Sequence, residues 1–195
     1  MRFKNKVVIV TGGARGIGKA TAMSFAREGA TVSVVDIDLE EAKKVALQIT
    51  SAGGEALALK ADVSNEKEVE KMIDTIYSKF GKIDILVNNA GIIRRGSTSE
   101  HTHQEWDRVI AVNLRGTFNC AKAVIPIMKK QRYGKIINVS SVAGKIGDIA
   151  SAPSYGSSKG AINTLTKSLA RELAEYGIYV NAVAPHAIQT EMSSE

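Results

Sequence analysis

Apolar and amphipathic stretches alternate along the whole chain. The first apolar run, Val7-Val8-Ile9-Val10, is rich in β-branched residues, which is typical of a parallel strand buried on both faces. Pro126 is expected to bend or interrupt the helix predicted at 104–130, near the end of that helix. The pattern predicts further strands at 31–35, 55–60, 83–87, 135–139 and 178–183. It predicts helices at 19–28, at 39–51, from Ser64 or Asn65 to about Phe80, at 104–130 and at 154–176.

This alternation of strand and helix predicts right-handed βαβ units and a parallel sheet covered by helices on both faces. We therefore expect an α/β fold, a doubly wound parallel sheet of the Rossmann type with three α/β/α layers. Residues 1–195 are expected to form a single domain. Ligands of such sheets bind beyond the carboxyl ends of the strands. Small or polar residues follow five of the predicted strands at that edge, namely Gly12, Asp36, Asp62, Asn89 and Ser141.

The segment 11–18, TGGARGIG, connects the first strand to the first helix. Its glycines at 12, 16 and 18 permit a tight turn, close approach of the backbone to a ligand and close packing of the helix. The exposed N–H groups and the dipole at the start of the helix suit a pyrophosphate. A dinucleotide is therefore the expected ligand of this turn, and a glycine-rich turn without a ligand is the alternative.

Asp36 ends the second strand, 18 residues after Gly18. In dinucleotide-binding folds, an acidic residue near this position hydrogen-bonds the 2′-hydroxyl of the adenosine ribose, and a carboxylate there would repel a 2′-phosphate. The sequence thus favours NAD over NADP, although Arg15 in the glycine turn could partner a phosphate. The alternative for Asp36 is a cap of the helix that follows, a role for which Asp38 competes.

Tyr155 and Lys159 are four residues apart in a predicted helix and therefore share one face. A nearby ammonium group lowers the pKa of a tyrosine, which can then exchange a proton with a hydroxyl or carbonyl group. Ser141 follows the fifth strand and could donate a hydrogen bond to a carbonyl oxygen. Asn113 lies in an apolar helix, where a buried amide needs a partner. The alternatives are an exposed tyrosine–lysine pair, a turn cap at Ser141 and a solvent-facing Asn113.

The composition, with 44% hydrophobic and 24% charged residues, is that of an ordinary soluble protein. No apolar run approaches the length of a membrane span, and the start, MRFKNK, leads into a strand, so we expect a cytoplasmic protein without a membrane partner. The single cysteine, Cys120, excludes an internal disulfide and is expected to be a buried filler. The net charge is +6 without a basic block interleaved with aromatic residues, which argues against a nucleic-acid partner. His101 and His103 lack further ligands nearby in the sequence, so no metal site is expected.

The motifs together resemble those of the short-chain dehydrogenase/reductases over nearly the whole chain, in that family's order and at its spacing. They are TGGARGIG at 11–18, Asp62-Val63, NNAG at 88–91, Asn113, Ser141, Tyr155-Gly-Ser-Ser-Lys159 and NAVAP at 181–185. The resemblance implies an oxidoreductase that uses a nicotinamide dinucleotide, NAD in preference to NADP in view of Asp36.

The resemblance also implies a role for each matching residue. Tyr155 would be the catalytic acid/base, and Lys159 would lower its pKa and bind the nicotinamide ribose. Ser141, in preference to Ser140, would polarise the substrate oxygen, and Asn113 would support a water path to Lys159. Asp62 and Val63 would meet the adenine, and Ile188 the nicotinamide amide. The positions expected to contact the cofactor are Gly12, Arg15, Gly16, Ile17, Gly18, Asp36, Asp62, Val63, Asn89, Ala90, Gly91, Tyr155, Lys159, Pro185 and Ile188.

Within the family the chain is most similar to the 3-oxoacyl-(acyl-carrier-protein) reductases. The substrate would then be a small-molecule ketone or secondary alcohol, either free or linked to acyl-carrier protein. NAD-dependent polyol, steroid and hydroxyacid dehydrogenases share every motif, and a non-catalytic dinucleotide-binding or scaffold protein is the alternative from another class. Family members pair helices that correspond to 104–130 and 154–176, so a homo-oligomer, a dimer or tetramer, is expected.

Two features depart from the family pattern. His186 stands where the family usually has a glycine after Pro185. The family also continues beyond the position of Glu195 with a substrate lid and a seventh strand. The sixth predicted strand, with the sequence YVNAVA, is apolar and expected to be buried on both faces, so we expect the natural protein to be longer than 195 residues.

Overall fold

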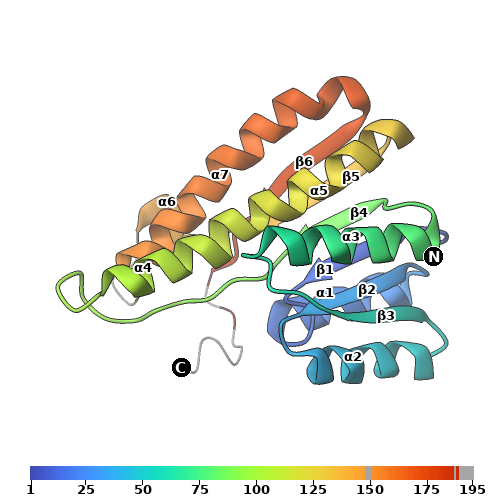
Figure 1. The fold of residues 1–195 in the computed structure, drawn as a ribbon, viewed down its shortest axis with the longest axis horizontal. Coiled ribbons are helices and arrows are strands. Elements are labelled where there is room, and N and C mark those ends of the chain that lie inside the picture. Colours follow the sequence, from blue (N-terminus) through green and yellow to red (C-terminus); the bar gives the residue numbers. More distant parts are fainter. Residues whose placement is uncertain (148–150, 187, 189–195) are drawn as a thin grey trace.

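The structure is a computed structural model that describes residues 1–147, 151–186 and 188. In this part of the chain, six strands form one parallel sheet in the order β3-β2-β1-β4-β5-β6 (Figure 1). The strands are β1 (Val7–Thr11), β2 (Thr31–Asp36), β3 (Glu55–Lys60), β4 (Ile85–Asn88), β5 (Gly134–Val139) and β6 (Ile178–Val183). The helices are α1 (Gly16–Arg27), α2 (Leu39–Ser51), α3 (Glu66–Phe80), α4 (His103–Ile110), the π-helical segment η1 (Ala111–Arg115), α5 (Gly116–Gln131), α6 (Ala143–Ile146), α7 (Pro153–Leu173) and the 3-10 turn η2 (Ala174–Tyr176).

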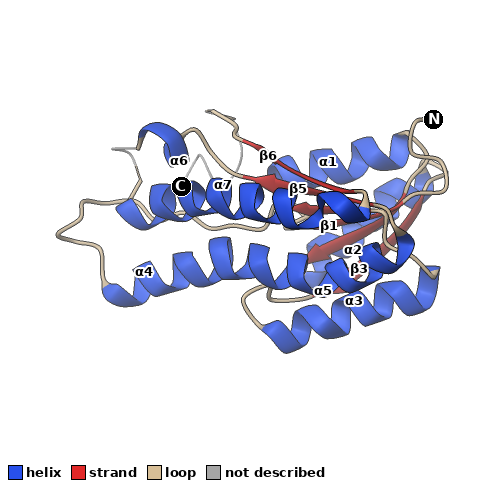
Figure 2. Cartoon of the chain, turned by 90° about the horizontal axis from the view of Figure 1, so that it is seen from above, coloured by secondary structure: helices blue, strands red, loops and turns tan. Residues whose placement is uncertain are grey.

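Helices cover both faces of this sheet, which gives two separate apolar cores (Figure 2). Val8 and Val10 pack with residues of α1 and α2, whereas Ile9 packs with residues of α3, α5 and α7. Alternate residues of a strand point to opposite faces, so one apolar run supplies both cores. The predicted doubly wound α/β/α sheet is confirmed. Its strand order reverses between β1 and β4, and ligands of such sheets bind at the carboxyl edge beside this reversal.

The connection from β1 to α1 is as close as two backbones allow. A Cβ atom on Gly18 would lie 1.9 Å from the carbonyl oxygen of Gly12 and 2.5 Å from Nδ2 of Asn89. Gly12 itself has a φ of +60°, and its Cβ would lie 2.8 Å from Cα of Ala90. The turn therefore requires glycine at both positions for steric reasons that do not involve a ligand.

The helix predicted at 104–130 is continuous in the structure from His103 to Gln131 and contains a π-helical segment. The stretch predicted as a single helix at 104–130 contains α4, the π-helical segment Ala111–Arg115 and α5. Pro126 lies inside α5 and does not interrupt it, so an interruption at that point was the wrong prediction. Val124 and Met128 on either side of Pro126 are fully buried, and this packing holds the helix although the proline lacks one N–H donor.

The sixth strand, for which burial on both faces is expected in a longer protein, is covered on one face by the residues that the structure describes. Ile178 and Val180 are buried, and α7 packs against β6. Tyr179 and Val183, which point to the other face, are 65% and 54% exposed. The elements that the structure describes therefore cover one face of this edge strand.

No helix among the described residues is long and apolar enough to cross a membrane.

The steric contact at Gly18 gives a direct test of the glycine turn. Gly18→Ala should lower the free energy of unfolding by about 1–3 kcal/mol or more, because the new methyl group must push α1 away from β1. Urea unfolding followed by circular dichroism measures this loss. Ser24→Ala, at an exposed position of the same helix, is the control and should leave the midpoint nearly unchanged. A Gly18→Ala protein with unaltered stability would contradict the proposed packing.

Candidate active site

Asn89 ties the end of β4 to the glycine turn. Its Nδ2 donates to the carbonyl oxygens of Thr11 and Gly12 at 3.0 and 2.9 Å, and its backbone N–H donates to Oγ1 of Thr11 at 3.1 Å. These bonds fix the position of the turn at the carboxyl edge of the sheet. The backbone of Arg15 is extended at the start of α1, and its side chain makes no capping hydrogen bond there. The uncapped helix start and the glycine turn thus fit the phosphates of a dinucleotide.

Two carboxylates follow β2 beside this turn. Asp36 accepts hydrogen bonds from the N–H groups of Ala14 and Asp38, both at 3.1 Å. Asp38, not Asp36, caps α2, because its Oδ1 accepts from the N–H of Glu41 at 3.2 Å. The alternative reading of Asp36 as the helix cap is therefore wrong. Oδ2 of Asp38 forms an ion pair with Arg15 at 2.8 Å.

The next expected pair, Asp62 and Val63, follows β3. Burial opposes ionisation of Asp62, but hydrogen bonds from Ser64 and the contact with Arg108 hold the pKa of its carboxyl below the ordinary value. Val63 is almost fully buried against the backbone of Gly116, and its carbonyl oxygen accepts from Asn119. Asp62 is the more accessible member of the pair.

Lys159 is buried, with 4% of its surface exposed. Its Nζ donates to the carbonyl oxygen of Val139, the last residue of β5, at 2.7 Å. Burial lowers the pKa of the Lys159 amine from 10.5 to about 8. The alternative of an exposed tyrosine–lysine pair is therefore wrong for the lysine. Tyr155 is half-buried one helical turn earlier, and Nζ of Lys159 lies 5.7 Å from the centre of its ring.

Asn113 is fully buried in the π-helical segment, so the solvent-facing alternative is also wrong. Its Oδ1 accepts from the N–H of Ile92 at 2.8 Å, and its Nδ2 donates to the carbonyl of Ile92 and to Oγ of Ser158, both at 3.0 Å. A Cβ atom on Gly91 would lie 3.2 Å from Oδ1 of Asn113 and 3.6 Å from Nζ of Lys159. The structure thus brings the NNAG segment, the π-helical segment and the start of α7 to one point.

The two serines after β5 lie in different environments. Ser140 is buried, and its hydroxyl donates to the carbonyl oxygen of Lys159 at 3.0 Å. Ser141 is half-buried, and its Oγ accepts from the N–H of Ala143 at 3.2 Å, a local turn contact that does not use the hydroxyl proton. A Cβ atom on Gly144 would lie 2.6 Å from the carbonyl carbon of Lys159. This close packing of α6 on α7 places the serine turn beside the Tyr155 helix.

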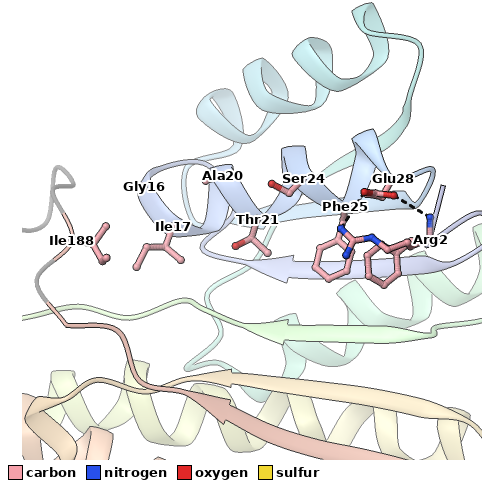
Figure 3. Close-up of a pocket in the computed structure, with 10 residues that line it drawn as sticks. Arg2, Gly16, Ile17, Ala20, Thr21, Ser24, Phe25, Glu28 and Ile188 are labelled. Atoms are coloured by element: carbon pink, nitrogen blue, oxygen red, sulfur yellow. Dashed lines mark hydrogen bonds and ion pairs between the residues drawn. The ribbon is translucent and has the colours of Figure 1, made fainter.

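Three more of the expected cofactor contacts, Gly16, Ile17 and Ile188, lie at a cavity along α1 (Figure 3). This cavity of about 500 Å³ is lined by Gly16, Ile17 and Ile188, and by residues farther along the helix such as Phe25. Figure 3 shows Ile188 beside Ile17 at the start of α1. Pro185 lies next to the serine turn, where its carbonyl oxygen accepts from the N–H of Val142 at 3.0 Å.

Other candidate groups show no sign of chemistry. Cys120 is fully buried, as expected of a filler, and burial raises the pKa of its thiol to about 12. In the described part of the chain, no three His, Cys, Asp or Glu side chains are placed to hold a metal ion. His101 packs edge-to-face on Trp106 and lies 3.6 Å from a carboxylate oxygen of Glu105.

Sequence reasoning missed the residues that support the site. Ser158 donates to the carbonyl oxygen of Tyr155 at 2.7 Å and links it to Asn113. Nothing in its local pattern predicts this bond, since a serine three residues after a tyrosine is common in helices. The burial of Ser140 and the clamp formed by Asn89 are likewise set by tertiary contacts. Gly144 could have been suspected as a close-packing position because it lies between a strand and a helix.

Comparisons with known proteins agree on the family to which this chain is similar. The family model for short chain dehydrogenases matches residues 6–195. A 3-oxoacyl-(acyl-carrier-protein) reductase of Thermotoga maritima is 42% identical over 195 residues, which are 100% of this chain and 79% of that protein. The protein of the same name from Synechocystis sp. is 45% identical over 189 residues, which cover 96% of this chain and 76% of that protein.

Solved structures with the same fold include other oxidoreductases. The crystal structure of levodione reductase superimposes with a TM-score of 0.94 at 39% identity, covering 98% of this chain and 75% of that chain. The structure of NAD+-bound xylitol dehydrogenase has a TM-score of 0.92 at 38% identity, covering 95% of this chain and 72% of that chain. The match to the family model over almost the entire sequence, with these relatives, shows that the chain belongs to the short-chain dehydrogenase/reductase family of oxidoreductases.

Proposed function

We propose that this oxidoreductase interconverts a ketone and a secondary alcohol with NAD, and that Tyr155, Lys159, Ser141 and Asn113 carry the proton chemistry. The observation that supports this most directly is the buried amine of Lys159 beside the ring of Tyr155. A scaffold protein that only bound a dinucleotide would not need a buried lysine next to a tyrosine. Burying an amine is unfavourable, so such a residue suggests function.

In this proposal the nicotinamide, when bound, supplies or accepts the hydride. Tyr155 gives its hydroxyl proton to the carbonyl oxygen as the alcohol forms, and takes a proton in the reverse direction. Lys159 keeps its proton in most molecules at neutral pH, and its charge stabilises the phenolate of Tyr155. The hydroxyl of Ser141 donates to the substrate oxygen. Asn113 and Ser158 hold the helix that carries Tyr155 and Lys159 in place.

We further propose that NAD is preferred over NADP. Asp36 lies beside the glycine turn with both carboxylate oxygens held by backbone N–H groups. A carboxylate at this place accepts a hydrogen bond from a ribose 2′-hydroxyl and repels a 2′-phosphate. The similarity to an NAD+-bound xylitol dehydrogenase supports the same choice.

For the substrate we propose a 3-oxoacyl thioester, carried on acyl-carrier protein or on a smaller thiol. The support is the 42–45% identity to curated relatives that bear this activity in their names. A polyol dehydrogenase is the second candidate, favoured by the structural similarity to xylitol dehydrogenase.

A substrate panel with the Tyr155→Phe variant tests the reaction. Absorbance of the reduced nicotinamide is followed with an acetoacetyl thioester, with xylitol and with simple ketones. Tyr155→Phe should lower turnover by about 10²–10⁴-fold, because it keeps the ring and removes the acid. It should bind the cofactor as before, and Tyr179→Phe at an exposed position of β6 should keep the wild-type rate. Unchanged turnover in Tyr155→Phe would remove this residue from the mechanism, and cofactor binding without turnover of any compound would favour the scaffold alternative.

The buried Lys159 predicts a pH dependence of stability. An unfolded lysine titrates near 10.4, whereas the folded protein releases this proton at about 8. Between these values the unfolded chain binds more protons, so the free energy of unfolding should rise with pH for the wild type relative to Lys159→Met. The relative gain from pH 7.5 to 10.5 should approach about 3 kcal/mol.

Urea unfolding of the cofactor-free protein across this pH range measures the difference. Lys122→Met is the control because Lys122 is exposed and pairs with Glu66, so it should show no such rise in this window. A difference between wild type and Lys159→Met that does not change with pH would show that Lys159 titrates normally.

Titration with both dinucleotides tests the cofactor preference. NAD should have the lower dissociation constant, and Asp36→Asn should narrow the difference because it removes the charge that repels a 2′-phosphate. Isothermal titration calorimetry gives both constants. Tighter binding of NADP to the wild type would reject the proposed preference.

A further inference from the structure

The glycine turn at 11–18 carries a positively charged side chain, Arg15, which forms an ion pair with Asp38. Nη2 of Arg15 lies 2.8 Å from Oδ2 of Asp38. The other oxygen of Asp38 is held as the cap of α2 by the N–H of Glu41, so the carboxylate is fixed from two sides. The N–H of Asp38 in turn donates to Asp36. Arg15, Asp36 and Asp38 therefore form one connected group beside the start of α1.

We propose that Asp38 is a second specificity-determining residue, which disfavours a 2′-phosphate by engaging Arg15. This inference rests on the proposed function, since it places the adenosine ribose of a dinucleotide beside Asp36. The inference gives Asp38, the cap of α2, a role in cofactor choice in addition to the role proposed for Asp36.

The charges of the group support this role. A guanidinium is the preferred partner of a phosphate, which it binds through two parallel hydrogen bonds. The side chains of Arg15, Asp36 and Asp38 have a total charge of −1. A phosphate monoester must therefore either displace Asp38 from Arg15 or lie close to two carboxylates. A 2′-hydroxyl carries no charge and avoids this conflict.

The exposure of the pair limits the size of the effect. The side chains of Arg15 and Asp38 are 55% and 39% exposed, so solvent and salt screen their interaction. A change of about five- to tenfold in the affinity for a 2′-phosphate is expected when the charge of Asp38 is removed at low salt.

Asp38→Asn is the suitable variant because asparagine caps helices as well as aspartate does. It removes the charge and keeps an oxygen that can accept from the N–H of Glu41. Glu40→Gln is the matched control, since it removes the same charge from the first turn of α2, where Glu40 pairs with Lys43 and not with Arg15. The double variant Arg15→Gln, Asp38→Asn tests whether any gain depends on Arg15.

The ligands are adenosine 5′-monophosphate and adenosine 2′,5′-bisphosphate, which differ only in the 2′-phosphate. Calorimetry should show that Asp38→Asn binds the bisphosphate about five- to tenfold more tightly than the wild type does, with the monophosphate within about twofold. Glu40→Gln should behave as the wild type, and the double variant should lose the gain. Increasing salt should reduce the difference.

The proposal would be overturned if Asp38→Asn had the same ratio of affinities for the two nucleotides as the wild type. It would also be overturned if Glu40→Gln gained as much affinity for the bisphosphate, or if the double variant kept that gain. Failure of the proposed cofactor preference is a separate result, because it appears as tighter binding of the bisphosphate than of the monophosphate to the wild type. If neither nucleotide bound the wild type, the dinucleotide site and this inference would both be rejected.

Discussion

The contact between Gly18 and the carbonyl oxygen of Gly12 sets the geometry on which the rest of the site depends. Because there is no space for a side chain, α1 approaches β1 as closely as the backbone allows. Asn89 fixes the end of β4 to the same turn through two carbonyl oxygens. The chain then runs from Asn89 to Gly91, which packs beside the amine of Lys159. A displacement of the glycine turn would therefore move the proposed phosphate-binding end and the proposed proton-transferring end of the site together.

Burial of the Lys159 amine favours the proposed proton transfer but is unfavourable for the stability of the fold. Its amine loses solvation and keeps a hydrogen bond to Val139, and the net result is a lowered pKa. The neighbouring amide of Asn113 is satisfied at both its oxygen and its nitrogen, so the surroundings of the lysine are rigid. A rigid and poorly solvated ammonium acts on an adjacent phenol more strongly than an exposed one, because water screens it less.

Hydrophobic periodicity predicted the strands and the doubly wound sheet, because an apolar run of a buried parallel strand is a local property of the sequence. It did not predict the π-helical segment around Asn113, whose side chain bonds to the backbone of Ile92, a residue 21 positions away. Spacing placed Tyr155 and Lys159 on one helix face, but the burial of Lys159 depends on packing with β5 and α6. The link through Ser158 was missed for the same reason, since tertiary contacts decide the partner of a side-chain hydroxyl.

In the proposed function, cofactor choice and proton transfer depend on side chains in opposite environments. Arg15 and Asp38 are partly exposed, so a change in their charge alters an interaction that solvent already screens and leaves the cores untouched. Lys159 and Asn113 are buried, and removing either one leaves its partners without a hydrogen bond in a medium where that is unfavourable. Substitutions of Arg15 or Asp38 that alter the proposed dinucleotide preference are therefore expected to be compatible with the fold, whereas substitutions of Lys159 or Asn113 are expected to affect stability and the proposed chemistry together.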